Sequence, residues 1–463
     1  MTQNTSDFPA PYGQDASGVE KNPAADEASF GDDEKKDITP PYAQDAYGEE
    51  EFAEVKYKTL KWWQCGLLMV AETVSLGVLS LPAAVAGLGF VPAVIILVAL
   101  GIFASYTGYV IGQFKNRYPQ VMNMADAGEV LAGKWGREIL GVAQMLFFVF
   151  VMASHLLTFT VAMNTLTDHG TCSIVFGVVG MVVSFILCLP RTLEKMSWLS
   201  LVSFISIFSA VMVCMIGIGI SKPGVNNVVA VVDTDLYHGF TAVTNIVFAF
   251  CGHAAFFGLA AELKDPRDFP KGLCLLQGID ISLYLVAAVV IYRFGGADVS
   301  SPALGSAGPI VGKVAYGIAL PTILIAGVIY GHVAAKYIYL RVFSGTDRMH
   351  KRDFVAVGTW VAIAAALWIL AWIIAEAIPV FSNLLSLITA LFASWFTYGL
   401  SGIFWLYMNK GVWFSNWKKV CLTLLNLLAF GVGAVLCGMG LWVSGKALHD
   451  HPSSASFSCA NNA

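Results

Sequence analysis

Four ionisable residues fall inside long apolar stretches of this 463-residue sequence, namely Glu72, His155, His253 and Asp280. An ionised carboxylate at the centre of a membrane helix costs about 2.5–3.5 kcal/mol on insertion scales, so such residues normally face a polar interior. Buried acids and histidines are also the groups from which proteins build proton relays. We therefore interpret these four residues as candidates for coupling a proton to a conformational change.

The four candidates have different alternative explanations. Glu72 ranks first because it adjoins an interruption in its apolar stretch, and His253 ranks second. His155 is more simply explained as a histidine that packs and hydrogen-bonds between helices. Asp280 has an alternative as the partner of Gln277 or of a neighbouring helix.

Two of the apolar stretches are interrupted at mid-depth. Residues 71–82 contain an acid, small polar residues, Gly77 and a proline, and residues 245–258 contain Gly252 followed by a histidine. Unwound backbone persists in hydrocarbon only where it lines a cavity and binds something, because its polar groups are otherwise unsatisfied. We therefore expect the first stretch to break near Gly77 and the sixth near Gly252.

Two broken helices would offer opposite charges to a ligand. A half-helix that begins near Gly77 presents free N–H groups to a carboxylate, and one that ends near Phe250 presents free carbonyls to an ammonium group. Both together fit an α-amino acid. The predicted binding residues are Thr73, Val74, Ser75, Leu76, Gly77, Phe248, Ala249, Phe250, Cys251 and Gly252.

The surroundings of these residues favour an uncharged side chain on the ligand. Phe248, Phe250 and Phe256 would face it, together with the apolar third and eighth stretches. The sequence offers no Arg or Lys at mid-membrane depth to pair with an acidic ligand side chain. Neutral amino acids are therefore the predicted ligands.

The composition places these residues in a bilayer. Hydrophobic residues make up 57% of the chain and charged residues only 13%, against about 25% charged in soluble domains. Stretches of spanning length recur from Trp62 onward. We place about eleven transmembrane helices near 62–84, 91–113, 139–163, 173–189, 198–220, 240–261, 272–292, 310–340, 355–375, 379–407 and 420–444. The fold class is therefore an all-α polytopic membrane protein.

The basic residues give the orientation, because Lys and Arg are retained on the cytoplasmic side. Of the 27 Lys and Arg residues, three lie in the first 55 residues, twenty flank the predicted cytoplasmic ends, and four lie on the other side. Those four are Lys222, Arg293, Lys313 and Lys446. We expect a cytoplasmic N-terminus and an extracellular C-terminus, where Cys172 and Cys459 would share the outer side and could pair. Because the basic residues follow a membrane edge, nucleic-acid binding has no support.

The two interrupted helices are five spans apart, and an odd offset inverts the second copy in the membrane. We therefore expect a five-plus-five inverted repeat, with repeat one at about 62–220, repeat two at about 240–407 and an extra helix at about 420–444. Short or Gly-interrupted spans at matching positions of two such halves indicate a midplane binding site. Residues 56–445 would form this domain, and 446–463 a short extracellular tail.

Residues 1–55 carry 14 acids and three bases, and this composition predicts a disordered cytoplasmic tail. The tail repeats a Pro-Tyr-x-Gln-Asp-Ala motif at residues 11–16 and 41–46. The duplication has two equally supported interpretations. It is a binding motif for a cytoplasmic trafficking partner, or it is a repeat without function in a segment that tolerates sequence change.

The residues 71–82 and the exit of the sixth span at 262–271 resemble the amino acid/auxin permease family, specifically its fungal neutral amino acid permeases. The resemblance extends over roughly residues 55–445. It implies a leucine-transporter-like fold, a plasma-membrane location and proton-coupled uptake of neutral aliphatic and aromatic amino acids, with no cofactor beyond the proton gradient. Many relatives carry Gly-x-Gly at the first break, whereas this chain has Ser75-Leu76-Gly77, which puts the carboxylate pocket in question.

Alternatives remain open at the level of sequence. Sodium coupling in this fold usually needs two hydroxyls in the eighth span, and residues 322–327 offer only Thr322, which favours protons. An amino acid sensor on a transporter fold would bind ligand with little net uptake. An enzyme or a metal site has no supporting motif in the spans. The preferred amino acid, the stoichiometry and the oligomeric state do not follow from the sequence.

Overall fold

The structure, a computed structural model, describes residues 57–463 except 192, 344–345, 347–352, 451–455 and 462–463. The acidic tail and its duplicated motif at 11–16 and 41–46 therefore lie outside the described residues. Every helix discussed below belongs to one compact unit.

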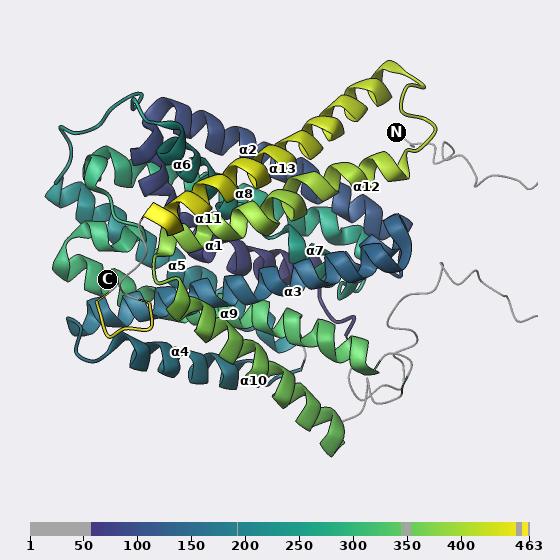
Figure 1. Cartoon of the computed structure of the whole chain (residues 1–463), viewed down its shortest axis with the longest axis horizontal. Helices are drawn as coiled ribbons and strands as arrows, with labels where there is room; N and C mark the ends of the chain where they lie inside the picture. The colour runs from purple at the N-terminus through teal and green to yellow at the C-terminus, as the bar shows by residue number, and fades with distance from the viewer. Residues whose placement is uncertain (1–56, 192, 344–345, 347–352, 451–455, 462–463) are drawn as a thin grey trace, which may run out of the picture. The chain divides into compact units, whose positions relative to one another are not determined.

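The described chain is helical almost throughout (Figure 1). Its longer helices are α1 (Trp62–Leu88), α2 (Phe90–Arg117), α3 (Met124–Thr167), α4 (Ser173–Leu187), α5 (Leu193–Ser221), α6 (Leu236–Ala249), α7 (His253–Ala261), α8 (Phe269–Gly295), α9 (Pro309–Phe343), α10 (Phe354–Ala377), α11 (Phe381–Ile388), α12 (Leu400–Met408) and α13 (Trp417–Asp450). A π-helical stretch, η5 (Thr389–Gly399), joins α11 to α12, and short 3₁₀ turns η1 (Pro266–Asp268), η2 (Gly296–Asp298) and η3 (Ala303–Ala307) flank α8 and α9.

Side-chain caps start several of these helices. Asn123 accepts a hydrogen bond from the Asp126 N–H at 3.0 Å, and Asp353 accepts one from the Ala356 N–H at 3.0 Å. Asp235 does the same for His238 at 2.8 Å, and this backbone hydrogen bond lowers the pKa of Asp235. Each cap satisfies an N–H group that the helix itself leaves without a partner, and so the boundary is set locally.

The number of spans agrees with the sequence prediction. Within the described residues, ten helical segments are long and apolar enough to cross a membrane, counting α6 with α7 and α11 through α12 as one segment each. The fourth predicted span is the shorter apolar helix α4, with 15 residues. The all-α membrane fold with about eleven helices is therefore confirmed.

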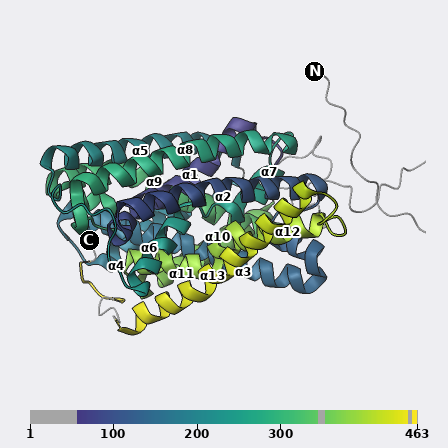
Figure 2. The ribbon, with the colours of Figure 1, turned by 90° about the horizontal axis from the view of Figure 1, so that it is seen from above.

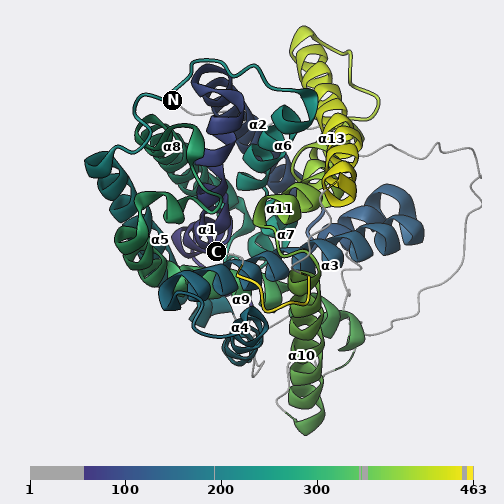
Figure 3. The ribbon, with the colours of Figure 1, turned by 60° about the vertical axis from the view of Figure 1, so that its left-hand side comes forward.

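The first and sixth spans lie inside the bundle. In the apolar 18-residue segment of α1, 94% of the residues are buried, and in that of α6–α7 89% are buried. In the corresponding segments of α2 and α13, only 28% of the residues are buried. Figure 3 shows α1 and α6 ringed by other helices, with α10 and α13 at the margin. In Figure 2 α5 and α8 border one side of the bundle and α13 the opposite side. The outer helices thus shield the inner pair from lipid.

Several helix contacts join spans that are five places apart. The first four spans, α1, α2, α3 and α4, each pack against the span five places later, which is α6, α8, α9 and α10 respectively. Because successive spans alternate in direction, the two helices of such a pair run in opposite directions, and the matching helices of a five-plus-five inverted repeat have this relation. The last helix, α13, packs mainly on η5 and α12, outside both repeats.

The predicted break in the first span is wrong. Helix α1 is continuous from Trp62 to Leu88, through Gly77 and across Pro82. Serine at position 75 favours the helix more than a second glycine would, and the Ser80 hydroxyl donates to the Gly77 carbonyl at 2.9 Å inside the turn. Gly77 instead serves close packing, since a Cβ there would lie 2.8 Å from the Ala249 Cα.

Two predicted boundaries also differ from the structure. The third span was expected to begin at 139, yet α3 begins at Met124 and kinks at Ala132 and Gly133, where φ of Gly133 is +62°. The charged residues of this segment obscured its helical character. The outer tail was expected from 446, but α13 continues to Asp450 because its apolar face still packs on the bundle.

At the end of the bundle where α4 begins and α10 ends, a disulfide joins Cys172 to Cys459, a pairing that the sequence analysis left possible. Beside it the Ser173 hydroxyl donates to the Ala460 carbonyl at 2.6 Å, and the Phe457 N–H donates to the Glu376 carbonyl at 3.1 Å. The segment around Cys459 is therefore fastened to the ends of α4 and α10.

Candidate functional site

The sixth span is interrupted where the sequence predicts. Helix α6 ends at Ala249, α7 begins at His253, and residues 250–252 between them form a non-helical segment, called the break from here on. The Cys251 N–H donates to the Phe248 carbonyl at 3.1 Å, which closes a tight turn in place of a helical hydrogen bond. The predicted break near Gly252 is confirmed.

The break lies against the middle of α1. The Thr73 hydroxyl oxygen would be 2.6 Å from a Cβ at Gly252, and Gly77 approaches Ala249 with no room for a side chain. All ten predicted binding residues, at 73–77 and 248–252, are buried. The structure thus brings the two predicted segments together in a closed arrangement, and their binding of an amino acid stays a prediction.

Tyr284 of α8 connects these two segments, and the sequence analysis did not identify it. Its hydroxyl lies 3.0 Å from the Thr73 carbonyl and 2.9 Å from the Ala249 carbonyl, and its single proton is shared between these two acceptors. The ring is fully buried and packs edge-on against Phe250, with centroids 5.4 Å apart. A tyrosine in an apolar span resembles a packing residue, so no local signal marks it.

Several buried polar atoms around the α1–break contact make no hydrogen bond among the described residues. They are the hydroxyls of Thr73 and Ser75, the Oδ1 of Asn245 and the Nδ1 of His253, and beside them the Glu72 carboxylate has the Tyr330 hydroxyl as its neighbouring hydrogen-bonding group. Most buried polar groups in proteins are hydrogen-bonded, and each exception needs a reason. A concentration of such atoms on two facing segments is typical of a ligand site.

Glu72 has no cation beside it. Its side chain is 3% exposed, and its electrostatic neighbours are Tyr330 of α9 and Cys251 in the break. Tyr330 in turn lies near the His155 ring, with centroids 6.4 Å apart. The first-ranked proton candidate therefore lies next to the break, and Tyr330 is a further polar residue there that the sequence analysis missed.

His253 is the first residue of α7. Its Nε2 lies 2.9 Å from the Ala104 carbonyl and 3.1 Å from the Thr107 hydroxyl, both on α2. A proton on Nε2 satisfies the Ala104 carbonyl, which leaves Nδ1 as the unpartnered atom. The ring therefore ties the break to α2, and its role in proton coupling stays a prediction.

The other two candidates lie further from the break. The His155 Nδ1 bonds to the Ile323 carbonyl at 2.9 Å, which is the packing arrangement weighed as its simpler explanation. Asp280 is fully buried one turn before Tyr284, and neither carboxylate oxygen has a hydrogen-bond partner among the described residues. Its suggested pairing with Gln277 is wrong, because the Gln277 Oε1 accepts from Ser105 at 3.2 Å.

One more intramembrane histidine escaped the sequence analysis. His332 of α9 is fully buried, and its ring packs edge-on against Trp360 at 5.2 Å. The signal was present, since position 332 lies within the predicted eighth span. It packs beside the Trp360 helix, α10, away from the break.

A buried ion pair closes the bundle at the end where α1 begins. Lys336 of α9 donates to Glu262 at the end of α7, and its ammonium lies 4.2 Å above the Tyr57 ring. Burial raises the pKa of Tyr57 to about 12. Leu60 and Leu263 pair as a short parallel bridge, with the Leu60 N–H donating to the Glu262 carbonyl at 3.0 Å. The segment before α1 is thereby fastened to the segment after α7.

Lys336→Met is expected to lower the free energy of unfolding by about 3–5 kcal/mol, because it leaves the 2%-exposed Glu262 charge buried without its partner. The measurement is the Tm of the purified protein in detergent. Lys313→Met is the matched control, since Lys313 pairs with the exposed Asp168 and exposed pairs contribute about 0–1 kcal/mol. A second Glu262→Gln change should restore most of the Tm. Equal Tm values for the two lysine variants would contradict a role for the buried pair.

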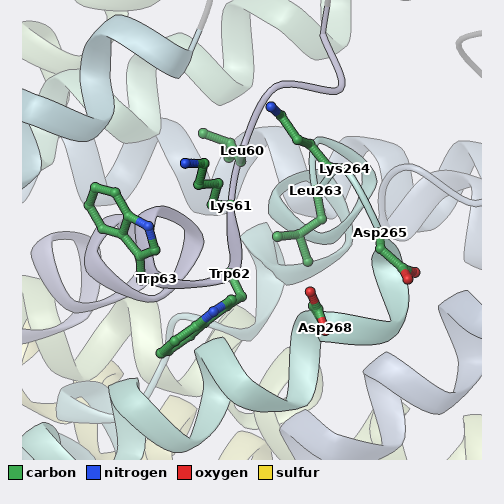
Figure 4. Close-up of a pocket in the computed structure, with 8 residues that line it drawn as sticks. All are labelled: Leu60, Lys61, Trp62, Trp63, Leu263, Lys264, Asp265 and Asp268. Carbon is green, nitrogen blue, oxygen red and sulfur yellow. The ribbon is translucent and has the colours of Figure 1, made fainter.

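Beside this ion pair lies a surface pocket that is separate from the break (Figure 4). Figure 4 shows Trp62 and Trp63 on one side and Asp265 and Asp268 on the other. The lining residues are Leu60, Lys61, Trp62, Trp63, Leu263, Lys264, Asp265 and Asp268. Asp268 is already engaged by Lys271 at 2.7 Å, so the acidic side of the pocket is partly neutralised. The pocket thus opens at the end of α1, whereas the unpartnered polar atoms lie at its middle.

Known proteins support this reading of the fold. A sequence model of the family described as transmembrane amino acid transporter protein matches residues 58–445. An N amino acid transport system protein of Neurospora crassa is 36% identical over 426 residues, which cover 89% of this chain and 91% of that protein. A transmembrane transporter of Fusarium pseudograminearum is 30% identical, covering 86% and 84% of the two chains.

Solved structures show the same fold at low sequence identity. The crystal structure of MhsT in complex with L-phenylalanine matches with a TM-score of 0.56 at 12% identity, covering 83% of this chain and all of that one. Mhp1, a nucleobase-cation-symport-1 family transporter, matches with a TM-score of 0.52 at 14% identity, covering 88% and 97%. Both support the leucine-transporter-like architecture predicted from the sequence. From the match of its family model and the identity to its fungal relatives, the chain belongs to the transmembrane amino acid transporter family.

Proposed function

We propose that this transporter imports neutral aliphatic and aromatic amino acids by proton symport across the plasma membrane, with a cytoplasmic N-terminus and an extracellular C-terminus. The observation that carries the proposal is the set of unpartnered buried polar atoms where the break meets α1. Such atoms are costly unless a ligand or a moving proton satisfies them for part of the transport cycle. The coupled movement of an amino acid and a proton would satisfy them in turn.

The chemistry around the break supports an amino acid with an uncharged side chain. The end of α6 supplies backbone carbonyls for an ammonium group, and α7 begins at His253, after Gly252, with no side-chain cap, which leaves its first amide groups for a carboxylate. Because α1 is unbroken, α7 replaces it as the proposed source of these amides. None of the described residues gathered at this contact is Lys or Arg, and Phe148, Phe250 and Tyr330 are buried nearby. The relative from Neurospora crassa is named as an amino acid transport system protein, which supports an amino acid as the substrate.

The surroundings of Thr322 support protons over sodium. Its hydroxyl donates to the Ser203 carbonyl at 2.7 Å and lies 2.6 Å from the Ser203 hydroxyl, both on α5. The one hydroxyl that the sequence offered for a sodium site is therefore engaged with another helix. Glu72, in contrast, is a buried acid beside the break with no cation near it. We infer that it carries the coupled proton.

Uptake by proteoliposomes tests the proposal. Labelled leucine, phenylalanine, glutamate and lysine are offered with an inward proton gradient, without it, and with sodium replaced by choline. We expect accumulation of leucine and phenylalanine that needs the gradient and survives the replacement of sodium. Accumulation that requires sodium would refute proton coupling, and preferred uptake of glutamate or lysine would refute the neutral substrate class.

A further inference from the structure

The two polypeptide segments of the candidate site come from opposite repeats and pack closely, but few side-chain hydrogen bonds join them among the described residues. Thr73 and Ala249 lie on α1 and α6, and the Ser80 hydroxyl makes one long contact, 3.4 Å, to the Asn245 carbonyl of α6. The packing of Gly77 on Ala249 has no side chain on either backbone larger than a methyl group. The hydroxyl of Tyr284 makes the two shorter bonds across this contact, at 3.0 and 2.9 Å.

This arrangement is unusual, because one phenol hydroxyl lies within hydrogen-bonding distance of backbone carbonyls on two other helices. The Thr73 carbonyl is 211 positions away in the sequence and the Ala249 carbonyl 35 positions away. The hydroxyl also lies 3.0 Å from where a Cβ of Gly77 would be, so it fills the space beside the closest approach of α1 and α6. The hydroxyl is fully buried at this contact and faces both carbonyls.

We propose that Tyr284 is a positioning residue of the transport site, whose hydroxyl fastens α1 to the end of α6 so that the break meets residues 73–77 in the geometry that binds substrate. This inference rests on the proposed function and adds a residue to it. A protein whose binding-competent arrangement is populated only in part binds with an affinity reduced by that fraction. Loss of the hydroxyl therefore raises KM more than it lowers the maximal rate.

The first test compares uptake kinetics of Tyr284→Phe with those of Tyr292→Phe. Tyr292 is the matched control because it lies two turns along the same helix, is equally buried, and bonds through its hydroxyl to the backbone of Val229 outside the site. For Tyr284→Phe we expect KM for leucine to rise about tenfold, which matches the loss of a buried hydrogen bond, with the maximal rate nearly unchanged. Tyr292→Phe should keep the wild-type KM.

The second test uses Cys251, which lies in the break and is 4% exposed. In a background that lacks the exposed or half-buried thiols of Cys274, Cys421 and Cys437, the rate of maleimide labelling reports how often the break opens. Tyr284→Phe should label at least several-fold faster than wild type and Tyr292→Phe. This measurement needs no substrate, so it tests Tyr284 even if the wild type takes up none of the amino acids and the proposed function fails.

A donor-bearing replacement separates the hydrogen bonds from the packing of the ring. Introducing 4-aminophenylalanine at position 284 keeps a donor in the same place, and it should restore both the KM and the labelling rate. Tyr284→Phe with the KM and Cys251 labelling of the wild type would overturn the proposal. A labelling rate that stays high with 4-aminophenylalanine would also overturn it, since the ring position and not the hydrogen bonds would then matter.

Discussion

Glu72→Gln is expected to abolish accumulation of amino acid by an inward proton gradient, while exchange of internal for external amino acid continues. Glutamine has the shape of the acid and can still accept a hydrogen bond, but it cannot gain or lose a proton. Glu72 is buried beside the break, with Tyr330 and Cys251 as its electrostatic neighbours, so a change of its charge acts directly on the segment that must open. The measurement is the ratio of internal to external leucine in proteoliposomes under a fixed pH gradient.

The matched control is Glu376→Gln, which neutralises another buried acid within a membrane helix. Glu376 belongs to α10 and lies next to Gly177 of α4, away from the break. It should retain gradient-driven accumulation. Glu72→Gln with the accumulation ratio of the wild type would show that another group carries the proton, and the same experiment would then be applied to His253 and Asp280.

The apolar spans and the break in the sixth span could be predicted because their signals are local. Twenty apolar residues in succession can only be buried in lipid or protein, and Gly252 followed by His253 interrupts an otherwise uniform apolar run. The expected break in the first span failed for a different reason. A glycine in a membrane helix serves either unwinding or close packing, and the choice at Gly77 depends on Ala249, far along the sequence.

The polar contacts of the site were the least predictable part. Tyr284 and Tyr330 have no sequence feature that distinguishes them from packing tyrosines, since their partners lie on other helices. From the sequence, Lys336 is one of the basic residues that flank the predicted cytoplasmic ends, and Glu262 is the first residue of the motif at 262–271. Nothing in the sequence indicates that the two form an ion pair. Side chains that act across helices become visible only when the helices are assembled, whereas the positions of the charges Glu72 and Asp280 could be located beforehand.

Gly77→Ala is expected to lower uptake about tenfold or more while the protein still folds. The added Cβ would lie 2.8 Å from the Ala249 Cα and 3.0 Å from the Tyr284 hydroxyl. Because the closest atom belongs to backbone, the clash cannot be relieved by turning a side chain, and the two helices must separate. Overpacking of this kind costs about 1–3 kcal/mol. Alanine also favours a helix by about 1 kcal/mol over glycine, so part of this loss of stability is offset.

The effect on transport should therefore exceed the effect on stability, and this difference identifies Gly77 as part of the site. Gly278→Ala on α8 is the matched control, because a Cβ there meets no atom within 4 Å. Uptake of leucine and the Tm are measured for both variants, with the labelling of Cys251 as a third readout. Cys251 should be labelled faster in Gly77→Ala than in Gly278→Ala. Separation of α1 from Ala249 also increases the distance between the Tyr284 hydroxyl and one of its two carbonyls. Wild-type uptake by Gly77→Ala would mean that the closest contact between the two repeats has no part in binding or movement of the substrate.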